Sequence, residues 1–316
     1  MVDLHARDVT VGYHGEDVVH AASLELAGSS VTALVGPNGS GKSTLLRTVA
    51  RLQQARSGSV DLRGAIDAHE ASRASRPRGT AGADATGTTV TGTTTTTTSS
   101  DATVTTDADV VDGLALTPKA FARQVALLTQ GRPVPGGLRV RDLVAFGRHP
   151  YRGRFGGQDP DGQTVVAHAL DVTGLTSLAE RPADELSGGQ LQRVWLASCL
   201  AQQTGVLLLD EPTTYLDLRY QVELLDLVRD LADHHGTAVG VVLHDLDQAA
   251  AVADRLVLLR AGVVVADGIP AEVLEADRLS DVYGIRVEVD HDPTTGGLRT
   301  RAVGRHHSRT TPAPAR

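Results

Sequence analysis

The chain has little cysteine and few aromatic side chains, and each shortage removes a class of function. Cys199 is the single cysteine among 316 residues, which excludes an intrachain disulfide framework and favours a reducing compartment. Aromatic residues make up only 3% of the chain, too few for the stacking platforms that bind single-stranded nucleic acid. The formal net charge of −8 also argues against binding through nucleic-acid phosphates. We therefore expect no nucleic-acid partner.

Long apolar runs are missing as well. No stretch approaches the roughly 18 apolar residues of a membrane-spanning helix, and the N-terminus lacks the apolar segment of a signal peptide. We expect a protein that is cytosolic or that reaches a membrane only by docking to another subunit.

A Gly-rich stretch is the strongest indication of chemistry. It has the pattern G-x-x-x-x-G-K-[ST], in which backbone N–H groups and the start of a helix bind phosphate oxygens. The mostly apolar residues 31–35 before it predict a buried strand, and apolar residues at helical spacing after it predict a helix. The stretch comprises Gly36, Pro37, Asn38, Gly39, Ser40, Gly41, Lys42, Ser43 and Thr44.

Two side chains of this stretch have specific expected roles. Lys42 is expected to reach the β- and γ-phosphates of a nucleotide, and the Ser43 hydroxyl to ligate Mg²⁺. The alternative is a Gly-rich turn with an incidental lysine. Lys42 and Lys119 are the only lysines in the chain, so an incidental match of the full pattern is improbable and nucleotide binding is favoured.

An acidic pair follows a second apolar run. Residues 206–209 predict a strand buried on both faces of a parallel sheet. Asp210 and Glu211 come next, at the carboxyl end where open α/β sheets bind ligands. Asp210 would hold the hydration shell of Mg²⁺, and Glu211 would accept a proton from attacking water. A surface acid pair that only caps a strand fits less well, because the apolar residues before the pair indicate that the strand leading to it is buried.

A threonine-rich stretch interrupts these patterns. Fourteen of the 27 residues from 80 to 106 are threonine, with no apolar alternation. We interpret residues 68–113 as a disordered surface insertion rather than a domain. A last strand is predicted at residues 285–289, and disorder is expected from about residue 301.

The motifs together identify a family. GPNGSGKST at residues 36–44, LSGGQ at 186–190, VLLLDEP at 206–212 and a later histidine occur in order. The sequence resembles the ATP-binding-cassette (ABC) ATPases, the motor subunits of ABC transporters, from about residue 2 to residue 289 outside the insertion. LSGGQ is the signature of that family and is more specific than the phosphate loop.

The resemblance implies an α/β fold. It would consist of a P-loop NTPase (RecA-like) core, an N-terminal antiparallel β-subdomain and an inserted α-helical signature subdomain at about residues 131–203. The ABC ATPase domain would cover residues 1–290, and residues 291–316 would form a C-terminal extension.

The resemblance also assigns roles to further residues. Gln130 would be the Q-loop glutamine that senses Mg²⁺ and the γ-phosphate, so Ser43, Gln130 and Asp210 form the expected metal set. His244 would be the switch histidine that contacts the γ-phosphate, although a capped histidine at a strand end is the structural alternative. With Glu211 as the base, the expected catalytic residues are Glu211, His244 and Gln130.

Nucleotide contacts are implied on either side of these residues. Tyr13 would stack on adenine, where its position alone also allows a partly exposed tyrosine at a strand end. Asp217 would lie in the D-loop that signals across a dimer. The signature residues would grip the γ-phosphate of ATP held by a second copy; they are Ser187, Gly188, Gly189 and Gln190.

These assignments imply an ATPase that hydrolyses Mg²⁺-ATP for a transporter. Two copies would sandwich ATP head to tail, at the cytoplasmic face of the membrane, beneath transmembrane permease subunits. A substrate-binding protein that delivers the cargo would be an indirect partner. Residues 140–153 and 213–221 are similar to those of ferric-siderophore importers, with haem, cobalamin and other metal chelates as alternatives.

Other classes left open are a nucleotide-dependent clamp on ribosomes or DNA, and a subunit that binds ATP without hydrolysing it. The histidines show neither i,i+4 nor Cys-paired spacing, so we assign no transition-metal site.

Overall fold

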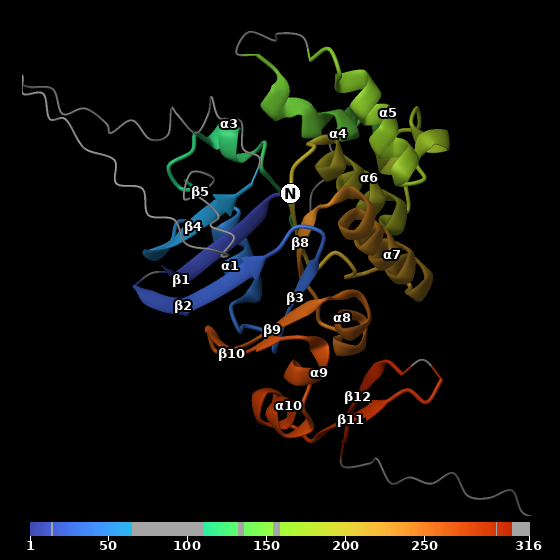
Figure 1. The fold of residues 1–316 in the computed structure, drawn as a ribbon. Helices are drawn as coiled ribbons and strands as arrows, with labels where there is room; N and C mark the ends of the chain where they lie inside the picture. The colour runs from blue at the N-terminus through green and yellow to red at the C-terminus, as the bar shows by residue number, and fades with distance from the viewer. Residues whose placement is uncertain (14, 65–109, 132–135, 154–158, 295, 305–316) are drawn as a thin grey trace, which may run out of the picture.

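A six-stranded sheet forms the centre of the molecule (Figure 1). The computed structural model describes residues 1–13, 15–64, 110–131, 136–153, 159–294 and 296–304. The strand order is β10-β9-β3-β8-β7-β6, and all neighbours are parallel except β10 and β9. The strands are β3 (Val31–Val35), β6 (Val125–Leu128), β7 (Val206–Asp210), β8 (Ala238–Val242), β9 (Arg255–Arg260) and β10 (Val263–Gly268).

Burial on both faces explains the apolar runs of this sheet. In β3, Val31, Ala33 and Val35 belong to one apolar core, while Leu34 points into the other. β7 and β8 are likewise buried along their whole length. The predicted parallel, doubly covered strands are therefore confirmed.

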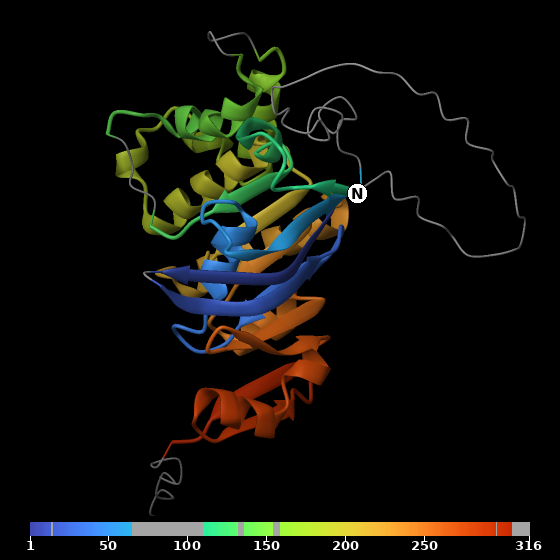
Figure 2. The ribbon, with the colours of Figure 1, turned by 90° about the vertical axis from the view of Figure 1, so that its left-hand side faces the viewer.

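An antiparallel sheet covers one face of the central sheet (Figure 2). Its order is β2-β1-β4-β5, and its buried residues alternate with exposed ones, as expected of a sheet with one solvated face. Helix α1 (Lys42–Val49) lies between the two sheets and packs on β1, β2, β7 and β8. The strands are β1 (Asp3–Tyr13), β2 (Glu16–Leu26), β4 (Ser57–Arg63) and β5 (Val110–Asp112).

Strand β5 lies inside the segment that we expected to be a disordered insertion. Its three residues pair with β4, so that Val110 lies opposite Arg63 and Asp112 opposite Asp61. The expectation was therefore wrong for residues 110–112, where pairing with β4 stabilises a strand of only three residues. Residues 65–109 lie outside the described part of the chain.

Helices cover the other face of the central sheet. α4 (Val140–Val144), α5 (Gly162–Val172) and α6 (Gly188–Ala201) pack on one another, and the 3-10 helix Ala145–Tyr151 packs on α6 (Figure 1). α7 (Leu218–His235) and α8 (Leu246–Val252) follow β7 and β8. Among the described residues, no helix combines the length and apolar character needed to cross a membrane. The shorter elements here are α3 (Pro118–Phe121) and the 3-10 helices Thr176–Leu178 and Ala183–Glu185.

The C-terminal part contains α9 (Pro270–Val273), α10 (Ala276–Tyr283) and a hairpin of β11 (Val287–His291) and β12 (Leu298–Ala302). β11 lies two residues later than the predicted strand. β12 was not predicted, and it runs past residue 301, where we expected disorder to begin. Residues 305–316 lie outside the described part of the chain. The Thr300 N–H and hydroxyl both donate to Asp247 Oδ1, which attaches the hairpin to α8.

Candidate nucleotide site

The phosphate loop joins β3 to α1, the strand-to-helix context that the motif requires. Gly36 has φ +141°, and a Cβ there would lie 2.1 Å from the backbone oxygen of Leu259, so only glycine fits. Gly41, with φ +99°, is the N-cap of α1 and leaves the first N–H groups of the helix facing the loop.

Lys42 lies back over the loop. Its ammonium group is buried and donates to the carbonyl oxygens of Gly36 at 2.8 Å and Pro37 at 2.9 Å. Burial lowers the pKa of Lys42, and the negative charges of Glu211 and Asp210 oppose that shift. The lysine is thus held at the loop by two carbonyls that a phosphate could replace.

Asp210 ends β7 and is 1% exposed. Arg47 of α1 donates to its Oδ2 from Nε at 2.9 Å and from Nη2 at 2.7 Å. The other oxygen, Oδ1, is buried and has no hydrogen-bond partner among the described residues. A buried carboxylate oxygen with free lone pairs is a suitable ligand for Mg²⁺ or its bound water, so the residues present fit that ion.

Glu211 has polar neighbours from two other segments and from its own loop. Gln130 Nε2 donates to Oε2 at 3.1 Å, and the Thr214 hydroxyl donates to the same oxygen at 3.4 Å. His244 Nε2 lies 2.8 Å from Oε1. Glu211 itself has φ +53°, an uncommon backbone conformation for a residue with a side chain, and such outliers cluster at functional sites.

Glu211 and His244 line a small cavity beside the loop. The cavity has a volume of about 150 Å³ and is lined by loop residues 38–44, Val18, Glu211 and His244. The structure therefore brings the phosphate loop, the acidic pair, Gln130 and His244 into one site, although they are far apart in sequence. Val18 and Arg47 belong to this site and were not predicted, because neither stands in a recognisable motif.

The signature residues form the start of α6. Ser187 is the N-cap of that helix and exchanges hydrogen bonds with Gln190, an arrangement known as a capping box. Gly188 lines a second cavity of about 180 Å³ together with Gln130 and Glu211. A Cβ on Gly189 would lie 2.9 Å from the Tyr220 ring. None of the four signature residues is among those that line the cavity at the phosphate loop.

The two remaining predicted contacts lie apart from that cavity. Tyr13 ends β1, is 45% exposed, and its hydroxyl group hydrogen-bonds to Gln53. Asp217 is the N-cap of α7 and accepts from the Tyr220 N–H at 3.0 Å. Asp217 thus has a local structural role in the single chain, and Tyr13 is partly exposed.

Comparison with known proteins gives a consistent result. The family model described as ABC transporter matches residues 19–214. The ferric enterobactin transport ATP-binding protein FepC of Escherichia coli is 35% identical over 302 residues, covering 96% of this chain and 94% of the relative. The iron(3+)-hydroxamate import ATP-binding protein FhuC of Bacillus subtilis is 34% identical, with 93% of each chain covered.

Two further similarities are more distant or partial. The cobalamin import ATP-binding protein BtuD of Halobacterium salinarum is 36% identical and covers 89% of this chain but 58% of the relative. A chain from a structure described as an inward-facing metal-chelate type ABC transporter superposes with a TM-score of 0.72 at 21% identity, covering 96% and 99% of the two chains. At that identity, the last similarity bears on the fold alone.

Proposed function

The chain belongs to the ABC transporter family as an importer ATPase, and from this premise we propose that it hydrolyses Mg²⁺-ATP to drive uptake of a ferric siderophore. The observation that carries the catalytic part is the convergence of Gln130 and His244 on Glu211, next to the phosphate loop. A carboxylate held by two side chains beside the loop that would bind the phosphates would accept the proton of attacking water.

The other residues would bind and orient the nucleotide. Lys42 would exchange its two loop carbonyls for phosphate oxygens, and the N–H groups at the start of α1 would bind the same anion. Ser43, Gln130 and Asp210 would hold Mg²⁺. When bound, this ion would neutralise part of the negative charge of the phosphates. Tyr13 would lie against the adenine ring. His244, at 2.8 Å from Glu211, would contact the terminal phosphate.

A homodimer would complete each site. The four signature residues do not line the cavity at the phosphate loop of their own chain, so a second copy would supply them head to tail. Tyr215 and Leu218, next to Asp217, are 94% and 75% exposed, and large exposed apolar side chains are typical of a surface that a partner covers.

Transport requires subunits that this chain does not contain. Importer ATPases act with membrane-spanning permease subunits, and we propose that this chain docks on them at the cytoplasmic face of the membrane. A binding protein would deliver the cargo. Ferric siderophores are the favoured cargo because several relatives named for iron chelates cover more than nine tenths of this chain. The cobalamin relative supports the alternative of another metal chelate.

Two experiments test this proposal: one measures ATP hydrolysis, and the other identifies the transported cargo. The purified chain should release phosphate from ATP only when Mg²⁺ is present, and Lys42→Ala should reduce that rate by at least about 100-fold. A strain that lacks the gene should lose uptake of radioactive ferric siderophore and regain it with the wild-type gene only. If that strain keeps ferric siderophore uptake but loses uptake of cobalamin or haem, the cargo assignment is wrong. If the chain releases no phosphate, either alone or with its permease, the ATPase assignment is wrong.

A further inference from the structure

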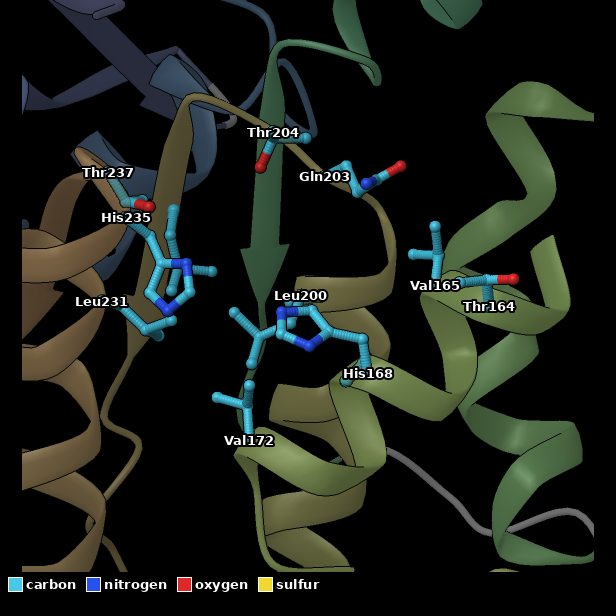
Figure 3. A pocket seen from close by; sticks show the side chains of 13 residues that line it. Thr164, Val165, His168, Val172, Leu200, Gln203, Thr204, Leu231, His235 and Thr237 are labelled. Carbon is cyan, nitrogen blue, oxygen red and sulfur yellow. The ribbon is translucent and has the colours of Figure 1, made fainter. Parts of the chain in front are cut away.

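A cavity separate from the nucleotide site lies between α5, α6 and the C-terminal end of α7 (Figure 3). Its volume is about 450 Å³, and its walls are apolar side chains such as Val165, Leu200 and Leu231. The residues that line it include no residue of the phosphate loop and neither Gln130, Glu211 nor His244. The mechanism described above therefore makes no use of this cavity.

Two histidines project into the cavity from different helices. His168 comes from α5 and His235 is the last residue of α7, and in Figure 3 the two rings lie in the space between these helices. The ring centroids are 6.3 Å apart and the ring planes are tilted by 56°. Sixty-seven positions separate the two residues in the chain, so sequence spacing could not reveal the pair.

The pair has the separation expected of two imidazoles that share a metal ion. A metal–nitrogen bond of about 2.0–2.1 Å places each ring centroid roughly 3.2 Å from the ion. Two such rings lie about 5.2 Å apart at a tetrahedral angle and about 6.4 Å apart when they are opposite each other. The observed 6.3 Å lies within this range, near its upper end. Rotation of either exposed side chain would close the difference of about 1 Å to tetrahedral geometry.

The surroundings favour one class of ion. No aspartate or glutamate is among the residues that line the cavity, so hard cations such as Mg²⁺ and Ca²⁺ have no carboxylate ligand there. Imidazole suits Zn²⁺, Cu²⁺, Ni²⁺ and Fe²⁺. The polar groups of Gln203, Thr204 and Thr237 also line the cavity and could hydrogen-bond to water on such an ion.

We propose that His168 and His235 form a two-histidine site for a borderline divalent ion, represented by Zn²⁺, that links α5 to the end of α7. Within the described residues, no group of three or more His, Cys, Asp or Glu side chains could hold a metal, so water completes the coordination. An ion that both helices bind only in the folded state stabilises the folded chain, and the effect grows with the logarithm of the free ion concentration once that concentration exceeds the Kd. The site is independent of ATP binding and of the transported cargo.

Titration of the purified, metal-free full-length chain with ZnCl₂ tests the site by calorimetry. Substitution His168→Ala or His235→Ala should weaken the tightest binding step by at least about tenfold, since even indirect support of a metal ligand contributes 10- to 100-fold. The double variant should bind no more weakly than either single variant, because one remaining imidazole cannot chelate. Zn²⁺ should also raise the unfolding temperature of the wild type more than that of the variants.

His234 provides the matched control. It is the neighbour of His235 on α7, but its Nδ1 lies 3.7 Å from Asp230 and it does not line the cavity. His234→Ala should leave Zn²⁺ binding unchanged. All proteins retain His306 and His307 of the tail, so differences among them report on the pair alone. Circular dichroism and ATP binding equal to wild type would show that each variant is folded. Equal Zn²⁺ affinity in wild type and His168→Ala would overturn the proposal.

Discussion

Arg47 donates from two nitrogens to a single oxygen of Asp210 and leaves the second oxygen of that carboxylate buried without a partner. The ion pair joins the helix after the phosphate loop to the strand before Glu211. Arg47 supplies the positive charge that the carboxylate of Asp210, only 1% exposed, needs. Its two hydrogen bonds also fix the direction in which the second oxygen of Asp210 points. Arg47 therefore connects the stability of this region to the orientation of an expected Mg²⁺ ligand.

Replacing Arg47 with methionine should lower the free energy of unfolding by about 2 kcal/mol. Loss of one partner of a buried ion pair costs about 3–5 kcal/mol, and the 40% exposure of the Arg47 side chain reduces that figure. Urea unfolding of the two proteins measures the difference.

A double-mutant cycle makes the Arg47 prediction specific. Asp210→Asn removes the charge that Arg47 neutralises, so Arg47→Met should cost less in that background. We expect a coupling free energy of at least about 1 kcal/mol. Additive effects of the two substitutions would show that the ion pair does not stabilise the fold.

Glu211→Gln should reduce ATP hydrolysis by about 10²- to 10⁴-fold, the usual contribution of a general base. Binding of ATP should persist, because the amide keeps the size of the carboxylate and leaves the phosphate loop intact. Phosphate release and size-exclusion chromatography with ATP measure the two effects, with ATP-dependent dimers expected to accumulate. Glu275→Gln, at the N-cap of α10, is the control and should hydrolyse ATP as the wild type does. Unchanged turnover in Glu211→Gln would remove Glu211 as the base.

Local pattern accounts for most of what could be predicted from the sequence. Residues 206–209 are all apolar, and residues 31–35 are apolar except for Thr32, because both faces of their strands are buried. Such a run can be recognised without a structure. The phosphate loop is legible for a similar reason, since its glycines and Lys42 are adjacent in the chain. The core of the fold was thus within reach of local pattern, whereas Gln130 and His244, which meet at Glu211, were assigned from the family resemblance.

Features that depend on distant contacts were not predictable. Strand β5 has three residues and no alternation, and it is a strand because it pairs with β4. The contact between Arg47 and Asp210 spans 163 positions, and no motif marks Arg47. His168 and His235 come together only because α5 and α7 pack at the same cavity. In each case the tertiary fold, rather than local preference, decides the outcome.

Asp159→Asn should destabilise the chain at neutral pH by about 3 kcal/mol, because Arg148 is buried and would lose its bidentate partner. The hydrogen bonds from Arg148 hold the pKa of Asp159 below its ordinary value, and so the folded state favours the ionised form. This stabilisation is present above the unfolded pKa of about 3.9 and is lost as the pH falls through the folded value.

Urea unfolding at several pH values measures this dependence. The difference between wild type and Asp159→Asn should be largest near neutral pH and should shrink in acid. Asp161→Asn, two residues away and exposed, is the control and should show little difference at any pH. A difference that does not change with pH would mean that the ionised form of Asp159 contributes nothing.

Tyr283→Phe tests a contact between α10 and the phosphate loop. Burial raises the pKa of the Tyr283 phenol to about 12, against the opposing effect of a hydrogen bond with the Gly36 backbone. The folded state therefore favours the protonated phenol: its contribution to stability is complete below pH about 10 and declines as the pH rises toward 12. Wild type should lose stability over that interval, and Tyr283→Phe should lose less.

Alkaline titration followed by phenolate absorbance checks the same assignment. One of the five tyrosines should titrate near pH 12 in the folded wild type and be missing in Tyr283→Phe. Tyr215→Phe is the control, since that side chain is 94% exposed and the step near pH 12 should remain in this variant. A wild-type titration in which all tyrosines ionise together would contradict the prediction.

Deletion of residues 80–106 should leave ATP hydrolysis within about twofold of wild type, since closing a shorter loop changes the free energy only slightly. The pairing of Arg63 with Val110 already places the ends of β4 and β5 side by side, and residues 64–79 and 107–109 remain to connect them. A second deletion, of residues 80–113, is the matched comparison. It removes β5 and the hydrogen bond from the Gly113 N–H to the Val60 carbonyl oxygen, and should lower the unfolding temperature. Phosphate release and thermal unfolding of both proteins measure these effects. A large loss of hydrolysis in the first deletion would show that the threonine-rich stretch takes part in the function of the ATPase.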